Sequence, residues 1–151
     1  MKVKQVILLV FIALALVIFV DYVASGKTLS SPVVEVIQKR QGADGRRYHY
    51  SYRVQTENQS FLVPKDFAEL LKPNDVVQFN VSPIFHQVNA FKDLKTGTTG
   101  QYSLRLFSGF LVPISCLLVF YLGWKYPKKM YVLTFVLQVV LLADLALLLT
   151  Q

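Results

Sequence analysis

Three long runs of apolar residues alternate with polar stretches along this chain of 151 residues. The runs cover Val6–Val20, Leu106–Trp124 and Met130–Leu149. About 20 apolar residues in a helix span the hydrocarbon core of a bilayer, because each residue adds about 1.5 Å along the helix axis. The pattern therefore predicts three transmembrane helices, over residues 5–24, 103–124 and 130–150. We expect the first helix to be a retained signal anchor rather than a cleaved signal peptide.

The polar stretch between the first two runs shows the two-residue alternation that is typical of half-buried β-strands. The alternation is clearest in one segment, where Tyr48, Tyr50, Tyr52 and Val54 share one face and Arg47, His49, Ser51, Arg53 and Gln55 share the other. We expect Tyr50 and Tyr52 to point into a β-core, while Arg47 and Arg53 point to solvent or to a partner.

Other segments of the same stretch also favour β-structure. Strands are predicted at residues 33–37, 60–63, 76–81 and 84–91, with a helical turn at 66–71. The predicted fold class is therefore membrane α+β: three transmembrane helices with a small five-stranded β-barrel or roll-like domain between helices one and two. The domain is expected over residues 30–92, and a linker rich in Gly and Thr over residues 93–102 leads to the second helix.

The net charge of +7 is distributed unevenly around the predicted spans. The lysines that flank them are Lys2, Lys4, Lys125, Lys128 and Lys129. Positive residues in short segments beside a membrane favour the cytoplasm. The aromatic residues around the short connection are Tyr121, Trp124, Tyr126 and Tyr131, as in an interfacial belt. We therefore expect the N-terminus and this connection inside, and the β-domain outside.

Polar residues within the spans are the first candidates for contact sites. Asp144 lies in the third span, where a charged group costs about 2.5–3.5 kcal/mol at the centre on insertion scales. It is expected either to bind another helix, including a helix of a partner protein, or to reach water at the outer interface. Thr134 and Gln138 share one face of the same span. Ser108 and Ser115 belong to a stripe of small residues that permits close helix approach.

Two more charged residues lie at the ends of spans. Asp21 is expected at the outer interface, where its carboxylate reaches water, and Arg105 is expected to extend its side chain outward from the second span. Pro113 is expected to kink the second span, because proline removes a helix hydrogen bond.

Basic residues concentrate on the first predicted hairpin of the β-domain, at Lys39, Arg40, Arg46, Arg47 and Arg53. This concentration favours contact with an anionic surface, either lipid headgroups or an acidic face of a partner. A solvated hairpin without a partner is the simpler alternative. Nucleic acid is not an expected partner, because the domain is predicted to lie outside the cytoplasm.

No catalytic or cofactor motif stands out in the sequence. Cys116 is the single cysteine and lies in an apolar run, where a reactive thiolate is disfavoured. His49 and His86 are the two histidines, and neither has a carboxylate or a cysteine at the spacing of a metal site. We therefore expect no enzymatic activity, no cofactor and no metal.

The tyrosine strand, the segment Lys72–Val77 and the strand that ends at Ser82-Pro83 resemble a group of uncharacterised bacterial membrane proteins. In that group a small extracytoplasmic β-domain lies between transmembrane helices. The resemblance covers Pro32–Phe91 and the arrangement of the helices. It implies the architecture and a bacterial cytoplasmic membrane, and it implies no mechanism because the group has no assigned activity.

These features favour a non-enzymatic accessory or scaffold subunit of a larger membrane protein complex, docking through its helices and its outer β-domain. Three spans are too few for a transporter built from inverted repeats. Other membrane subunits and the lipid bilayer are the expected partners. The alternative is a stand-alone or homo-oligomeric membrane module that binds a lipid or a small ligand at the outer face.

Overall fold

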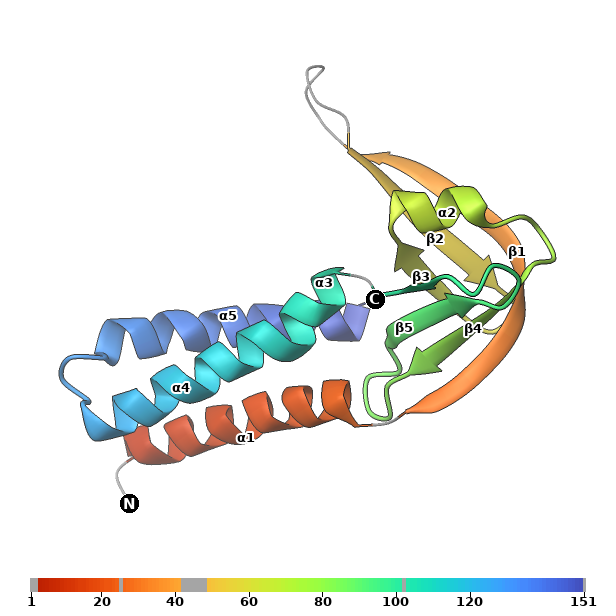
Figure 1. Cartoon of the computed structure of the whole chain (residues 1–151). Helices are drawn as coiled ribbons and strands as arrows, with labels where there is room; N and C mark the ends of the chain where they lie inside the picture. The colour runs from red at the N-terminus through yellow and green to blue at the C-terminus, as the bar shows by residue number, and fades with distance from the viewer. Residues whose placement is uncertain (1–2, 25, 42–48, 102, 151) are drawn as a thin grey trace. The chain divides into compact units, whose positions relative to one another are not determined.

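The computed structural model describes residues 3–24, 26–41, 49–101 and 103–150 (Figure 1). The chain divides into two compact units. The helical unit consists of Met1–Ser25, Ser82–Gln87 and Ser103–Gln151, and the β-unit consists of Gly26–Val81 and Val88–Tyr102. The β-unit is therefore not the uninterrupted insertion that the sequence predicted, because Ser82–Gln87 belongs with the helices.

Three helices of membrane-spanning length and composition make up most of the helical unit. The first is α1 (Val3–Val23) and the third is α5 (Tyr131–Thr150). The second runs without a break through α3 (Ser103–Leu106), the π-helical turn η1 (Phe107–Leu111) and α4 (Val112–Lys125). The prediction of three such helices is confirmed, with ends within a few residues of those expected.

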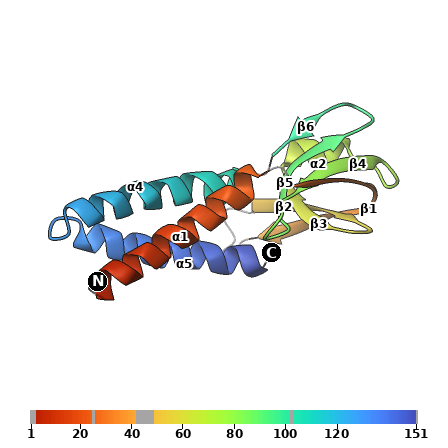
Figure 2. The same ribbon diagram turned by 90° about the horizontal axis from the view of Figure 1, so that it is seen from below.

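The three helices lie side by side in both views of the chain (Figure 1, Figure 2). Helix α4 packs against both α1 and α5. Their common core contains side chains with no exposed surface, namely Ala15, Ile18, Cys116, Phe120 and Leu141. Most other apolar side chains point away from this core, as expected for helices whose outer surface faces lipid.

The π-helical turn η1 comes directly before Pro113. The N–H of Val112 donates to the carbonyl of Phe107, five residues back, where an α-helix would use a carbonyl four residues back. Pro113 has no N–H to give to Gly109, and its ring crowds that carbonyl. The sequence predicts a kink at this proline, and the structure has a widened turn directly before it.

The β-unit is one curled antiparallel sheet of six strands in the order β3-β2-β1-β4-β5-β6. The strands are β1 (Lys27–Gln41), β2 (His49–Thr56), β3 (Ser60–Val63), β4 (Val76–Val81), β5 (Val88–Asp93) and β6 (Thr99–Gly100). The short helix α2 (Lys65–Leu70) contributes Phe67, whose ring centroid lies 4.5 Å from that of Phe91. Val54, Val77 and Phe79 complete the centre of the core, each at most 1% exposed.

The first strand is longer than the sequence predicted and runs through Pro32. Residues up to Pro32 pair with β4, and residues from Val33 onward pair with β2, with a bulge between Val33 and Glu35. Proline lacks an N–H, so it is tolerated at bulges and where strand pairing changes. The segment that we expected to break the strand is instead the place where β1 changes partner.

The predicted fifth strand and the predicted linker are both wrong in position. Strand β5 begins only at Val88, and residues 82–87 form turns. The expected linker contains strand β6, which pairs with β5 at Phe91 and Lys92. The sheet therefore has six strands where five were expected, and its two outermost strands β3 and β6 do not pair within the described residues.

The tyrosine strand is present, but only part of the predicted face is buried. Val54 is fully buried and Tyr52 packs against the core, whereas Tyr50 is 52% exposed, contrary to expectation. Strand β3 pairs with Tyr52–Gln55 only, so Tyr50 lies beyond the end of β3. The alternation is correct, but the core is shorter than the hairpin. Arg47 lies outside the described residues, and Arg53 is half-buried.

Candidate functional site

Two helix ends bring opposite charges together inside the helical unit. Asp21 lies in the last turn of α1, and Arg105 lies in α3 at the start of the second long helix. Nη2 of Arg105 lies 2.8 Å from Oδ2 of Asp21, and the two side chains are 4% and 0% exposed. Burial of two charges is costly unless further hydrogen bonds satisfy their remaining atoms. The other contacts of Asp21 therefore decide what this pair does.

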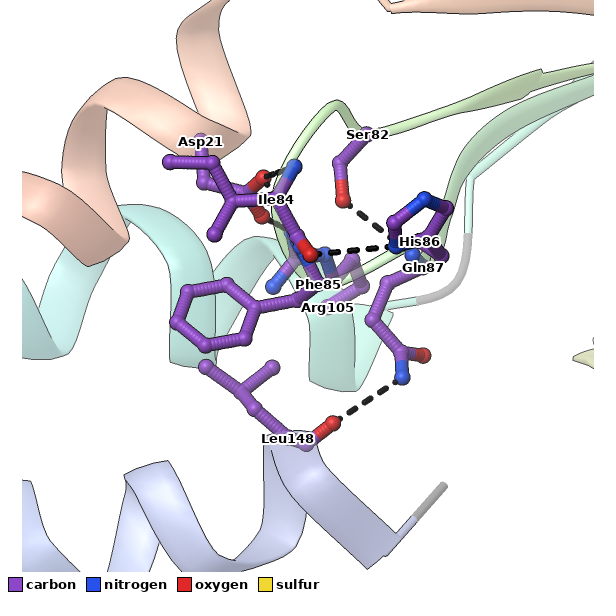
Figure 3. A network of polar contacts seen from close by, with 8 residues as sticks. All are labelled: Asp21, Ser82, Ile84, Phe85, His86, Gln87, Arg105 and Leu148. Carbon is purple, nitrogen blue, oxygen red and sulfur yellow. Dashed lines mark hydrogen bonds and ion pairs between the residues drawn. The ribbon is translucent and has the colours of Figure 1, made fainter.

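The second oxygen of Asp21 binds the backbone of the 82–87 loop (Figure 3). Oδ1 accepts hydrogen bonds from the N–H groups of Ile84, at 2.7 Å, and Phe85, at 3.2 Å. Hydrogen bonds to an ionised acceptor are stronger than those between neutral groups. The ring of Phe85 also packs against the apolar core of the helices. The carboxylate thus holds the loop backbone on the helices while Phe85 anchors it by apolar contact.

The 82–87 loop is closed at its base and bound to a further helix. The N–H of Ser82 donates to the carbonyl of Gln87 at 2.8 Å, and the N–H of Gln87 donates to Ser82 Oγ at 3.1 Å. Nε2 of Gln87 donates to the carbonyl of Leu148 at 3.1 Å. Carbonyls in the last turn of a helix lack partners within the helix, so Gln87 satisfies a group of α5 that needs one. The loop therefore contacts all three long helices, through Asp21 of α1, Leu148 of α5 and the apolar core that α4 shares with them.

The structure corrects the predicted environments of Asp21 and Arg105. Both were expected at the outer interface with access to water, and both are instead buried and paired. They are 84 residues apart in sequence, so no local pattern joins them. One feature of the sequence could have predicted the pair. The end of the first span and the start of the second carry opposite charges, and these two ends must lie on the same side of a membrane.

Asp144, the most conspicuous candidate in the sequence, is buried by its own chain. It is 6% exposed, and the polar groups that face it belong to Ser108 and Arg105. Asp144 therefore faces another helix of its own chain, which is one of the two expected environments, and a contact with a partner protein stays a prediction. The Oδ2 atom of Asp144 and the Oγ atom of Ser108 are buried and make no close hydrogen bond, although the hydroxyl faces the carboxylate. The polar cluster of the helical unit consists of Asp21, Arg105, Ser108 and Asp144.

A cavity of about 190 Å³ adjoins the polar cluster. Arg105, Ser108 and Asp144 form its polar wall, and the remaining lining is apolar. The chemistry of the two halves of the cluster is therefore different. The oxygens of Asp21 are occupied by Arg105 and by the loop, whereas Asp144 presents an acceptor without a close hydrogen bond beside an open space.

The remaining predicted residues of the spans are distributed differently. Thr134 and Gln138 share a face as expected and line a depression of about 760 Å³ at the opposite, lysine-bearing end of the helices, with Lys4 and Lys128. Thr134 lies against Gly123 of α4, where a Cβ atom would stand 2.6 Å from its Oγ1. Ser115 is exposed, unlike Ser108, so the predicted stripe of small residues does not form one buried face.

The basic residues of the first hairpin are only partly described. Lys39 and Arg40 are exposed in β1, and Arg53 is half-buried in β2. Arg46 and Arg47 lie outside the described residues. The predicted contact with an anionic surface stays a prediction.

Among the described residues of the β-unit, Asp93 is a buried carboxylate that stabilises a turn. Its oxygens accept hydrogen bonds from the N–H groups of Lys95 and Thr96, and from the hydroxyl of Thr96 at 2.6 Å. Burial raises the pKa of Asp93, but these hydrogen bonds outweigh it and hold the pKa below the ordinary value. Asp93 is therefore a structural carboxylate.

The described residues offer no cluster of three or more His, Cys, Asp or Glu side chains that could hold a metal ion. Cys116 is wholly buried in the helical core. His86 is exposed in the 82–87 loop, where its Nδ1 lies 3.0 Å from the carbonyl of Ile84. The side chain of His49 lies outside the described residues.

Comparison with known proteins gives no match to a family model, to a curated protein or to a solved structure.

Proposed function

We propose that this protein is a non-enzymatic accessory or scaffold subunit of a larger membrane protein complex. The observation that carries the proposal is that the buried Asp21–Arg105 ion pair holds the 82–87 loop on the helices. Both side chains are almost wholly buried, and both carboxylate oxygens of Asp21 are committed to Arg105 and to the backbone of the 82–87 loop. A charged centre without exposed surface is suited to holding a loop in place and unsuited to reacting with a substrate.

The exposed arm of the β-unit supplies a surface on which a partner could dock. Beyond the end of β3, the paired strands β1 and β2 carry the exposed side chains of Lys39, Arg40 and Tyr50. Arginine and tyrosine are enriched among residues that dominate binding at interfaces. Cationic side chains beside an aromatic ring suit an acidic face on a partner protein. Exposed Ser115 offers a small residue for close approach of another helix within the membrane.

The proposed setting is the cytoplasmic membrane of a bacterium, with the N-terminus inside and the β-unit outside. This orientation is supported by the exposed lysines and aromatic residues at one end of the helical unit, including Lys125, Lys128, Trp124 and Tyr131. Positive residues in short connections favour the cytoplasmic side, and aromatic rings favour the interface.

The proposal is tested by purification of the full chain from its native host in mild detergent, followed by native mass spectrometry. We expect a second membrane protein in fixed stoichiometry. The double variant Lys39→Glu, Arg40→Glu reverses the charge of the arm, and we expect it to weaken this association about tenfold or more, as loss of charge complementarity does. The control is Lys72→Glu, Lys92→Glu, which makes the same change in charge at two exposed lysines elsewhere in the β-unit.

Two results would overturn the proposal. One is recovery of the chain alone or only as a homo-oligomer, which would favour a stand-alone module that binds a lipid or small ligand at the outer face. The other is equal loss of the associated protein from both double variants, which would show that the arm has no specific part in docking.

A further inference from the structure

The cavity beside Asp144 has a carboxylate oxygen and a hydroxyl in its wall. Oδ2 of Asp144 and Oγ of Ser108 are buried without a close hydrogen bond, although the hydroxyl faces the carboxylate, and the two side chains are 6% and 8% exposed. Both residues line the same cavity of about 190 Å³. A buried carboxylate oxygen without a close donor leaves room for one from a ligand. A ligand that carries N–H or O–H groups would supply one.

The charges of the polar cluster indicate the sign of that ligand. Arg105 forms its ion pair with Asp21 at 2.8 Å, so one guanidinium faces two carboxylates, those of Asp21 and Asp144. When both carboxylates are ionised, the cluster has one negative charge beyond that balanced by Arg105. A cation beside Asp144 would balance this charge and so favour the ionised carboxylate.

The apolar part of the cavity indicates what carries the cation. Leu104, Phe107 and Leu147 line the cavity and are also exposed on the outside of the helices, Phe107 at 54%. The wall of the cavity therefore includes apolar side chains on the outer surface of the second long helix and of α5, and such side chains suit acyl chains. Asp144 lies six residues before Thr150 at the end of α5, which is a depth of about 9 Å along a helix. That depth is close to the headgroup layer.

The π-helical turn supplies part of this wall. Ser108 belongs to η1, whose extra residue follows from Pro113. Widened turns of this kind occur frequently at functional sites in helices. A cavity of this size also exceeds by far the roughly 10–15 Å³ of such volume that a single water needs.

We propose that this cavity binds the primary ammonium group of a phospholipid such as phosphatidylethanolamine, with Asp144 Oδ2 and Ser108 Oγ as acceptors. A primary ammonium provides three N–H donors and one positive charge, which match the two acceptors and the excess carboxylate. This inference goes beyond the scaffold role, because a lipid in the cavity neither requires nor excludes a protein partner.

The test compares two lipids that differ in their donors. The full chain is stripped of lipid in detergent and titrated with phosphatidylethanolamine or phosphatidylcholine of identical acyl chains, and bound lipid is counted by native mass spectrometry. The choline headgroup has the same positive charge but no N–H group. We expect phosphatidylethanolamine to bind about tenfold more tightly or better, as for one hydrogen bond to a charged group.

Four variants locate the binding. Asp144→Asn and Ser108→Ala should each remove most of this preference. Asp144→Asn removes the negative charge of one acceptor, and Ser108→Ala removes the other acceptor. Asp66→Asn, at an exposed residue of α2, and Ser60→Ala, at an exposed residue of β3, make the same chemical changes elsewhere and should leave the preference unchanged. Ser108→Ala keeps the charges of the cluster, so it decides the matter if Asp144→Asn fails to fold.

The proposal is overturned if the two lipids bind equally to the unmodified chain, or if Ser108→Ala retains the full preference. Displacement of the lipid by free ethanolammonium or sodium ion at equal concentration would overturn the lipid as the ligand. Retention of phosphatidylethanolamine against both ions would support it.

Discussion

At the scale of single residues, Asp21 performs two tasks that substitution can separate. Its charge balances Arg105, and its Oδ1 accepts the N–H groups of Ile84 and Phe85. Asparagine at this position retains a carbonyl oxygen for the loop but loses the charge, whereas leucine loses both. Removal of one member of a buried ion pair typically costs about 3–5 kcal/mol, because the other charge is left without a counter-charge.

We therefore predict that Asp21→Leu and Arg105→Met each lower the thermal stability of the detergent-solubilised chain strongly, and that the double variant loses less than their sum. Circular dichroism at increasing temperature measures this. Hydrogen exchange at the amides of Ile84 and Phe85 should remain slow in Asp21→Asn and become fast in Asp21→Leu. Additive losses of stability, or equal exchange in both variants, would contradict the assigned roles.

At the scale of helices, close packing depends on small residues at two positions. A Cβ atom on Gly109 would collide with the ring of Tyr22 and stand 2.8 Å from the Cβ of Tyr22. Gly123 similarly leaves room for Thr134 of α5. Glycine thus allows η1 to approach α1 and α4 to approach α5, even though glycine is a poor helix former.

Gly109→Ala tests whether this approach matters. Helix propensity alone favours alanine by about 0.8–1 kcal/mol, whereas overpacking typically costs about 1–3 kcal/mol. Because the new Cβ would crowd the Cβ of Tyr22 as well as its ring, we predict that the cost of overpacking exceeds the gain in helix propensity. The melting temperature should therefore fall. Ser115→Ala, at an exposed position of the same helix, is the control and should change stability by no more than about 0.5 kcal/mol. A stabilised Gly109→Ala variant would show that α1 moves aside without cost.

At the scale of the whole molecule, the open question with the widest consequence is its orientation in the membrane. If all three helices span the membrane, the α4–α5 connection lies on the same side as the start of α1. The lysines of this connection predict that this side is the cytoplasm. The β-unit, with its exposed arm, would then lie outside.

Cysteine labelling in intact cells measures this orientation. In a Cys116→Ala background, which removes the buried native thiol, we predict that Lys92→Cys reacts with a membrane-impermeant maleimide and that Lys128→Cys reacts only after the cells are opened. The reverse pattern would invert the topology and would place the basic arm against cytoplasmic partners.

Local composition and periodicity were enough to predict several helices and strands correctly. Length and apolarity were sufficient for the three helices, and alternation was sufficient for the tyrosine strand and for strands β3 and β4. Pro113 was correctly expected to disturb its helix, because a missing N–H acts locally. The prediction of buried side chains was right for Tyr52 and wrong for Tyr50. Alternation shows which face of a strand a side chain occupies, but it does not show where the core ends.

The contacts between residues that are distant in sequence depend on how the helices and the 82–87 loop pack in three dimensions. Asp21 binds Arg105 across 84 positions and Ile84 across 63. Residues 84–87, which were predicted as the start of a strand, lie instead in the loop that Asp21 binds. Asp144 acquires its neighbours and its cavity in the same way. Local patterns constrain the backbone within a few residues, whereas burial of a charge and capture of a loop depend on how whole helices pack. For that reason the polar cluster could not be predicted from the chain as a linear pattern.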